Sequence, residues 1–136
     1  SIFVLIPILS SFFIAIPTHA GRFEPVSGKC WFFRGQELDL QQSCTLSGYS
    51  WTGGGYTVIR WEDGVETVIR FGKQGRGSLL GCQTENSKQR VTVDNVCGEW
   101  YHRDLDTFEP VEADPSNREE LMRCVAVNGN SVCWNY

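Results

Sequence analysis

Six cysteines constrain the fold of this chain more than any other feature of its sequence. All six follow residue 20, and their number is even, which in an exported chain is typical of a disulfide framework. A metal site needs cysteine or histidine ligands only a few residues apart, and no two of these cysteines are that close. We therefore predict no bound metal and three disulfides between sequence neighbours. The predicted pairs are Cys30–Cys44, Cys82–Cys97 and Cys124–Cys133.

The last of these pairs follows from a turn. In the segment "CVAVNGNSVC", Asn128-Gly129 is a strong two-residue hairpin signal, because both positions tolerate a positive φ. A turn centred there brings Cys124 directly opposite Cys133, and such opposite residues lie close enough for a disulfide. The other two pairs follow only from the simplest scheme, in which each pair of neighbours closes its own hairpin, and they remain open to exchange.

The first 20 residues predict export. Residues 1–20 contain no Lys, Arg, Asp or Glu, and their apolar run is shorter than the roughly 20 residues that span a membrane. The run ends in Thr18-His19-Ala20, which has the small residues of a secretory cleavage site. We predict a signal peptide over 1–20, cut after Ala20, and a secreted or periplasmic single domain over 21–136. The alternative is an uncleaved segment that anchors the chain in a membrane.

The remaining sequence is rich in strand-forming residues. "TVIRW" (57–61) and "TVIRF" (67–71) contain β-branched and aromatic residues, and "EDG" (62–64) between them suits a three-residue hairpin loop. A two-residue turn is also predicted at 35–36, where glycine comes first. The 62–64 loop pairs Arg60 with Glu66 and Val58 with Val68. It places four apolar residues on the opposite face, which is the better core candidate: Ile59, Trp61, Val65 and Ile69.

Two segments give weaker signals. Residues 79–97 predict another strand pair, with a bulge near 94–95 because the valines there do not alternate regularly. The segment "DPSNREELM" (114–122) is the only helix-like one, and Ser116 with Glu119 fits a capping box. Its periodic stretch is short, so we expect at most one short helix.

These patterns predict an all-β fold, a small antiparallel sandwich or open barrel of about seven or eight strands that is stabilised by disulfides. In style the chain resembles small exported cysteine-rich proteins of unknown function found in cyanobacteria. The features that carry the resemblance are "CWFFRGQELDLQQSC", the "WEDGVET" hairpin and the terminal "NGNSVCW". The resemblance implies an exported location and this style of fold, and it implies no chemistry.

Few residues suggest catalysis. His102 is the only histidine after residue 20, and Asp104 and Asp106 follow it at alternating positions. In a strand all three would share a face, as an acid–base group or a metal half-site requires. The alternative is a solvated strand face with ordinary charges. Serine-hydrolase and phosphate-loop motifs are absent, and we predict no cofactor. A hydrolase that uses His102 or an unmarked carboxylate pair remains an alternative function.

The segment "GYSWTGGGY" (48–56) is the best candidate for binding. It combines aromatic rings, which suit sugars or a protein partner, with glycines that let a ligand approach the backbone. The alternative is a connector whose aromatic residues fill the core. The candidate binding residues are Tyr49, Trp51, Gly53, Gly54, Gly55 and Tyr56.

The expected function is therefore a binding, inhibitor or envelope-associated module that contacts a glycan or an exported protein. A purely structural envelope protein is the other alternative to the hydrolase. A net charge of −4 with scattered Lys and Arg disfavours nucleic acid, and contact with a membrane is expected only through an uncleaved 1–20 segment.

Overall fold

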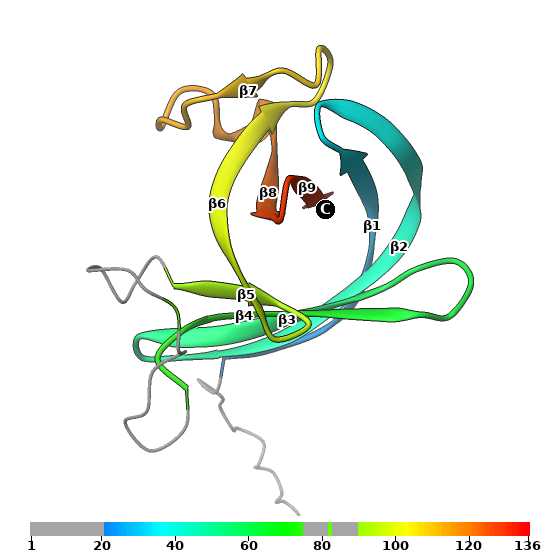
Figure 1. The fold of residues 1–136 in the computed structure, drawn as a ribbon. Coiled ribbons are helices and arrows are strands. Elements are labelled where there is room, and N and C mark those ends of the chain that lie inside the picture. Colours follow the sequence, from blue (N-terminus) through cyan, green and yellow to red (C-terminus); the bar gives the residue numbers. More distant parts are fainter. Residues whose placement is uncertain (1–20, 75–81, 83–89) are drawn as a thin grey trace, which may run out of the picture.

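The computed structural model describes residues 21–74, 82 and 90–136. The predicted signal peptide and most of the predicted strand at 79–85 lie outside the described residues. Those residues contain nine strands and one turn of 3-10 helix (Figure 1). The elements are β1 (Arg22–Arg34), β2 (Glu37–Trp51), β3 (Gly54–Arg60), β4 (Glu66–Gly72), β5 (Val91–Val93), β6 (Val96–Asp104), β7 (Pro110–Val111), η3 (Arg118–Glu120), β8 (Leu121–Val127) and β9 (Asn130–Asn135).

Eight of these strands close into an antiparallel barrel. Along the sheet they follow the order β5-β4-β3-β2-β1-β9-β8-β6, and β6 also pairs with β5. Figure 1 shows β1, β2 and β6 curving round the molecule, with β3, β4 and β5 crossing below them. Strand β7 pairs with β6 and does not take part in the closure. The predicted small antiparallel all-β fold is confirmed, and the barrel is closed instead of open or split into a sandwich.

The closure depends on the length of β6. Its first three residues, 96–98, pair with β5, and its remaining residues, 99–104, pair with β8. Because β6 pairs with both β5 and β8, it connects the two ends of the sheet and closes the barrel. Pairing of this kind links segments that are distant in sequence, so the local hydrophobic pattern could not distinguish a closed barrel from the alternatives.

Side chains from all eight barrel strands fill the interior. Successive residues of a strand point to opposite faces, and one face of each strand contributes to a single apolar cluster. Leu46, Ile59 and Ile69 are fully buried there, and each such side chain contributes roughly 1.5–3 kcal/mol to stability. The predicted core positions of Ile59 and Ile69 are confirmed. The prediction for Val65 is wrong, because Val65 lies in the β3–β4 turn and is 57% exposed.

All three predicted disulfides are present: Cys30–Cys44, Cys82–Cys97 and Cys124–Cys133. Cys124 lies directly opposite Cys133, as the terminal turn predicts. Both turn residues, Asn128 and Gly129, have positive φ. Cys30 reaches its partner diagonally, because the residue opposite Cys30 is Gln42. Three disulfides indicate an oxidising, extracytoplasmic environment.

A second apolar cluster lies on the outer face of β1, β9, β8 and β6. Its buried members are Trp31, Phe33, Met122, Cys124 and Cys133. The β6–β8 connection, residues 105–120, covers this cluster with Leu105 and Phe108. Backbone hydrogen bonds from Asp104 N to Glu109 O and from Leu105 N to Glu120 O, both 2.9 Å, hold the connection in place. We call this outer surface the covered face.

Two local predictions are wrong. Residues 94–95 form a two-residue turn instead of a bulge, and Val93 lies opposite Val96. Both turn residues have positive φ, which suits their Asp and Asn side chains. The Ser116 capping box does not form, because the Ser116 hydroxyl donates to Asp114 at 2.6 Å and only one 3-10 turn follows.

Within the described part of the chain, no helix has the length and apolar character needed to cross a membrane.

Candidate functional site

The barrel has an apolar pocket at the end where the β3–β4 and β5–β6 turns lie. Its volume is about 770 Å³, within the range of small-molecule sites. Barrels of eight strands have an interior that can hold one small ligand. The apolar side chains that line the pocket are Phe32, Leu40, Trp61, Val65, Val93 and Val132. We call this pocket the barrel mouth.

Apolar side chains of the barrel mouth are exposed to solvent. Leu40 is 41% exposed and Val65 is 57% exposed, although apolar side chains of this size are favoured in the core. The Trp61 ring is fixed in the wall, because its Nε1–H donates to Thr67 Oγ1 at 2.9 Å. The mouth is therefore a preformed apolar surface that a ligand could cover without rearranging this wall.

The polar groups of the barrel mouth are acidic or neutral. Glu62, Asp63 and Asp94 line it together with Gln42 and Thr67, and the described residues that line it include no Lys, Arg or His. Asp63 and Asp94 each accept a backbone N–H bond of 2.9 Å, from Val65 and Val68 respectively, so these carboxylates are held in fixed positions. An acidic rim of this kind disfavours an anionic ligand and favours a neutral or cationic one.

The predicted aromatic residues form a cluster on the outer face of β2, β3 and β4, which we call the bare face. Tyr49 lies directly opposite Tyr56 in the sheet. The Trp51 ring lies 6.0 Å from the Tyr49 ring and 6.3 Å from the Tyr56 ring, measured between centroids. The Trp51 Nε1–H donates to Lys73 O at 2.7 Å, and Trp51 remains 36% exposed. The structure thus brings the three rings together at the surface.

The three glycines of the same segment have a structural role. Gly54 and Gly55 are buried, and a side chain on Gly54 would meet the Lys73 backbone at 2.3 Å. On Gly55 it would meet Tyr49 O at 2.6 Å. Gly53 lies in the β2–β3 turn with φ of 88°. Gly54 and Gly55 thus allow close contact between segments of the chain itself, and a role of the three glycines in ligand binding stays a prediction.

His102, Asp104 and Asp106 do not form a shared site. Asp104 ends β6 and accepts backbone N–H bonds from Asp106 and Thr107 at 2.8 and 2.9 Å, and these bonds lower the pKa of its carboxyl. Asp106 lies beyond the strand in the following turn, so the three residues do not alternate on one face. Burial, with the charges of Arg123 and Arg118, lowers the pKa of His102. Among the residues described, no group of three or more His, Cys, Asp or Glu side chains could hold a metal ion.

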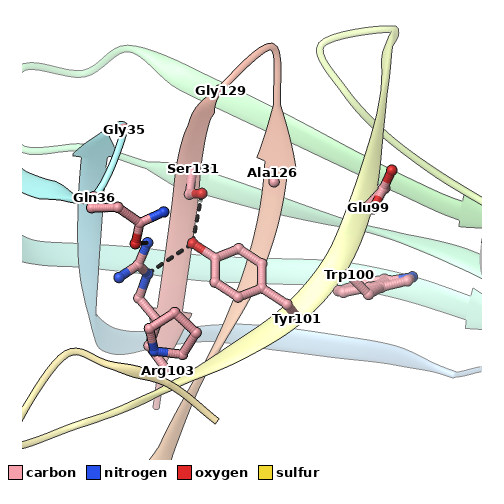
Figure 2. Close-up of a pocket in the computed structure, with 10 residues that line it drawn as sticks. Gly35, Gln36, Glu99, Trp100, Tyr101, Arg103, Ala126, Gly129 and Ser131 are labelled. Atoms are coloured by element: carbon pink, nitrogen blue, oxygen red, sulfur yellow. Dashed lines mark hydrogen bonds between the residues drawn. The ribbon is translucent and has the colours of Figure 1, made fainter. Parts of the chain in front are cut away.

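A smaller pocket of about 340 Å³ lies on the covered face, where the β1–β2 and β8–β9 turns meet (Figure 2). Arg103 lines it and is only 2% exposed. Its guanidinium lies 4.0 Å from the centroid of the Phe33 ring and 5.2 Å from that of Tyr101. Figure 2 shows the polar ends of Gln36, Tyr101 and Ser131 gathered around Arg103. We call this site the arginine pocket.

The sequence missed both pockets. The residues of the barrel mouth come from strands spread along the whole chain, and neither pocket has a linear motif. One usable signal was present, since Val65 is an apolar residue directly after the predicted 62–64 turn. No feature of the sequence indicated that Arg103 is buried, because arginine side chains are mostly exposed.

The comparisons with known proteins identify no relative. No family model matches the chain, and no curated protein or solved structure does either. The function is therefore inferred from the residues and their geometry.

Proposed function

We propose that this chain is an exported, non-catalytic binding domain that holds a small apolar ligand in the barrel mouth. The observation that carries the proposal is the open pocket of about 770 Å³, lined mainly by apolar side chains. Sites for small ligands are typically preformed and mostly apolar, and the mouths of β-barrels are among their preferred places. The three disulfides fit an exported scaffold whose shape does not depend on the ligand.

The ligand should carry an uncharged or cationic polar end. Its apolar part would cover Leu40, Val65 and the Trp61 ring, and its polar end would lie near Glu62, Asp63 or Asp94. An anionic end would approach these carboxylates without a compensating cation in the lining. Among molecules of equal chain length we therefore expect an alkylamine to bind best, an alkyl alcohol less well and an alkyl carboxylate least.

Calorimetric titration of the domain with these three probes tests the proposal. Val65→Arg places a bulky cation at the mouth and should weaken alkylamine binding by roughly tenfold or more, about 1.4 kcal/mol. Val111→Arg is the matched control, because Val111 is an exposed valine on β7 that does not line the mouth. Equal affinity for all three probes, or unchanged binding by the Val65→Arg variant, would contradict the assignment.

The aromatic cluster of the bare face supports a second candidate function, contact with a glycan or an exported protein. The observation in its favour is that Trp51 is both exposed and held in one orientation by its bond to Lys73 O. Aromatic rings of this kind suit sugar faces and the centres of protein interfaces.

Screening on peptidoglycan, polysaccharides and exported proteins would test this second function. Removal of an anchoring aromatic side chain costs about 2 kcal/mol, so Trp51→Ala should weaken such binding roughly 30-fold. The Val65→Arg variant separates the two candidates, because it should leave binding at the bare face intact. Binding that survives Trp51→Ala would exclude the cluster as the contact surface.

A further inference from the structure

We propose that the arginine pocket binds a small carboxylate anion through Arg103 and a hydroxyl group of the Tyr101–Ser131 pair. The proposal is independent of the barrel mouth, which lies elsewhere and is lined by carboxylates. It rests on a buried charge without a counter-charge, on donors without acceptors, and on the pocket beside them.

The first observation is the isolated positive charge of Arg103. The side chain is almost completely buried, and the ion pairs found among the described residues, Arg34–Asp39 and Arg60–Glu66, do not include it. Burial of a charge is costly unless an opposite charge is nearby. Glu99 lines the same pocket, but Figure 2 shows its carboxylate at the far end, away from the guanidinium.

The second observation is the number of unused donors. Arg103 donates from Nε to Tyr101 Oη at 2.7 Å, from one terminal nitrogen to Phe108 O at 2.8 Å, and from the other to Gln36 Oε1 at 3.3 Å. These three acceptors are neutral, and a guanidinium has five N–H groups. One N–H on each terminal nitrogen thus has no acceptor among the described residues. Two N–H groups on neighbouring nitrogens of one guanidinium can bind a carboxylate together.

The third observation is a leftover hydroxyl proton. Tyr101 Oη and Ser131 Oγ are 2.6 Å apart, and Arg103 can only donate to this pair. The bond between the two hydroxyls uses one of their two protons, whichever group donates it. The other proton has no acceptor within the described part of the chain, and Ser131 is only 5% exposed to solvent. A buried donor without an acceptor is unfavourable, and an anion in the pocket would accept from it.

The shape of the pocket fits a small anion. Gly35, Gly129 and Ala126 form part of its wall, so no long side chain from these positions fills the space. The volume of about 340 Å³ is at the lower end of the range for ligand sites. Figure 2 shows the guanidinium and the Ser131 hydroxyl on either side of the Tyr101 hydroxyl, to which both are hydrogen-bonded.

Nuclear magnetic resonance can test the site directly. Sodium acetate is titrated into the 15N-labelled domain while the Arg103 Nε–H signal and the amide signals of Gln36 and Ser131 are followed. Sodium chloride at the same ionic strength is the control for general screening. We expect saturable shifts at these three residues with acetate and none with chloride. Shifts that are absent, that do not saturate or that are equal for the two salts would overturn the proposal.

A conservative variant keeps the test independent of folding. The double variant Tyr101→Phe/Ser131→Ala removes both hydroxyl protons and retains Arg103, so acetate affinity should fall roughly tenfold, as expected for loss of a hydrogen bond to a charged group. Ser43→Ala is the matched control, because Ser43 is an exposed serine outside the pocket. If the folded double variant binds acetate as tightly as the unchanged domain, the hydroxyls have no part in the site and the proposal fails.

Discussion

Two outer faces of the barrel wall carry tryptophan, and only one of them is covered. On the covered face, Trp31 is 3% exposed beneath the 105–120 connection. On the bare face, Trp51 is 36% exposed and contacts Tyr49 and Tyr56. Both residues point away from the barrel interior. The difference between them therefore arises from a connection distant in sequence and not from the strand pattern around each tryptophan.

This comparison separates two uses of a large aromatic residue. A covered ring is removed from water and stabilises the fold in proportion to its buried area. A ring left at the surface contributes less to stability, and the chain supplies no described segment to bury it. Exposed aromatic clusters of this kind are candidates for contact with other molecules. The predictions below test whether the two faces differ in this way.

The largest effect is expected for Trp31→Ala. Removal of a fully packed ring from the covered face leaves a cavity among Phe33, Met122 and the Cys124–Cys133 disulfide, and such substitutions cost about 3–5 kcal/mol. Urea unfolding of the disulfide-intact domain measures this cost. A loss below about 1 kcal/mol would mean that the 105–120 connection does not cover the face as described.

The next effect is expected for the double variant Cys124→Ala/Cys133→Ala. The disulfide closes a short loop with a sequence separation of 9, so on the chain-entropy model its removal costs about 2–3 kcal/mol. Both cysteines also belong to the second apolar cluster, on the covered face. The control is Cys30→Ala/Cys44→Ala, which removes a disulfide in the barrel interior with a sequence separation of 14. Its loss of unfolding free energy should be similar or slightly larger. No measurable loss in either variant would exclude a stabilising role for these bridges.

A smaller effect is expected for Trp51→Ala on the bare face. The variant loses the contacts with two tyrosine rings and one hydrogen bond to Lys73 O. These interactions together stabilise the fold by about 1–2 kcal/mol, less than we expect for Trp31. Equal unfolding costs for the two tryptophan variants would refute the distinction between the faces.

The sequence predicted the local parts of this fold and not its long-range parts. The turns at 35–36, 62–64 and 128–129 follow from glycine positions that favour positive φ. The turns at 62–64 and 128–129 also gave the observed registers, whereas the β1–β2 register shifts between Phe32 and Phe33. The closure of the barrel through β6 and the cover over Trp31 depend on residues far apart in the chain. No short-range pattern contains that information, so the sequence left the sandwich and the open barrel as alternatives.

The candidate sites show the same limit. The nearness of Tyr49, Trp51 and Tyr56 in the sequence suggested the cluster, whereas their place on one outer face depends on the β2–β3 pairing. The packing role of Gly54 could not be predicted, because the backbone that it approaches, at Lys73, belongs to the segment after β4. Whether the aromatic cluster binds a ligand stays a prediction. The barrel mouth and the arginine pocket became visible only with the barrel closed.

A still smaller effect is expected for the ion pair beside the bare face. Arg60 and Glu66 are opposite each other on β3 and β4, with a contact of 2.7 Å between exposed side chains. Exposed pairs of this kind stabilise by about 0.2–1 kcal/mol. A double-mutant cycle with Arg60→Ala and Glu66→Ala should give a coupling in this range that decreases in 1 M salt, by about the extent expected from screening. A larger coupling that is insensitive to salt would show that the pair is shielded from solvent.

The smallest expected effect is the titration of His102, which follows the inward-facing Trp100 on the same side of β6. Burial and the nearby Arg123 and Arg118 lower the pKa of His102 below its ordinary value of 6.5. Between the lowered pKa and 6.5 the unfolded chain therefore holds more protons than the folded domain, and stability rises with pH. The contribution of His102 is fully present above pH 6.5 and is lost as the pH falls through the lowered pKa.

His102→Gln removes this titration, so its unfolding free energy should depend less on pH than that of the unchanged domain between about pH 5 and pH 8. Urea unfolding at several pH values provides the measurement. Asp104 and Asp114 do not interfere in this range, because hydrogen bonds lower the pKa values of their carboxyls below the ordinary 3.8. An unchanged or steeper pH dependence in the variant would mean that His102 is not held in its neutral form by the folded domain.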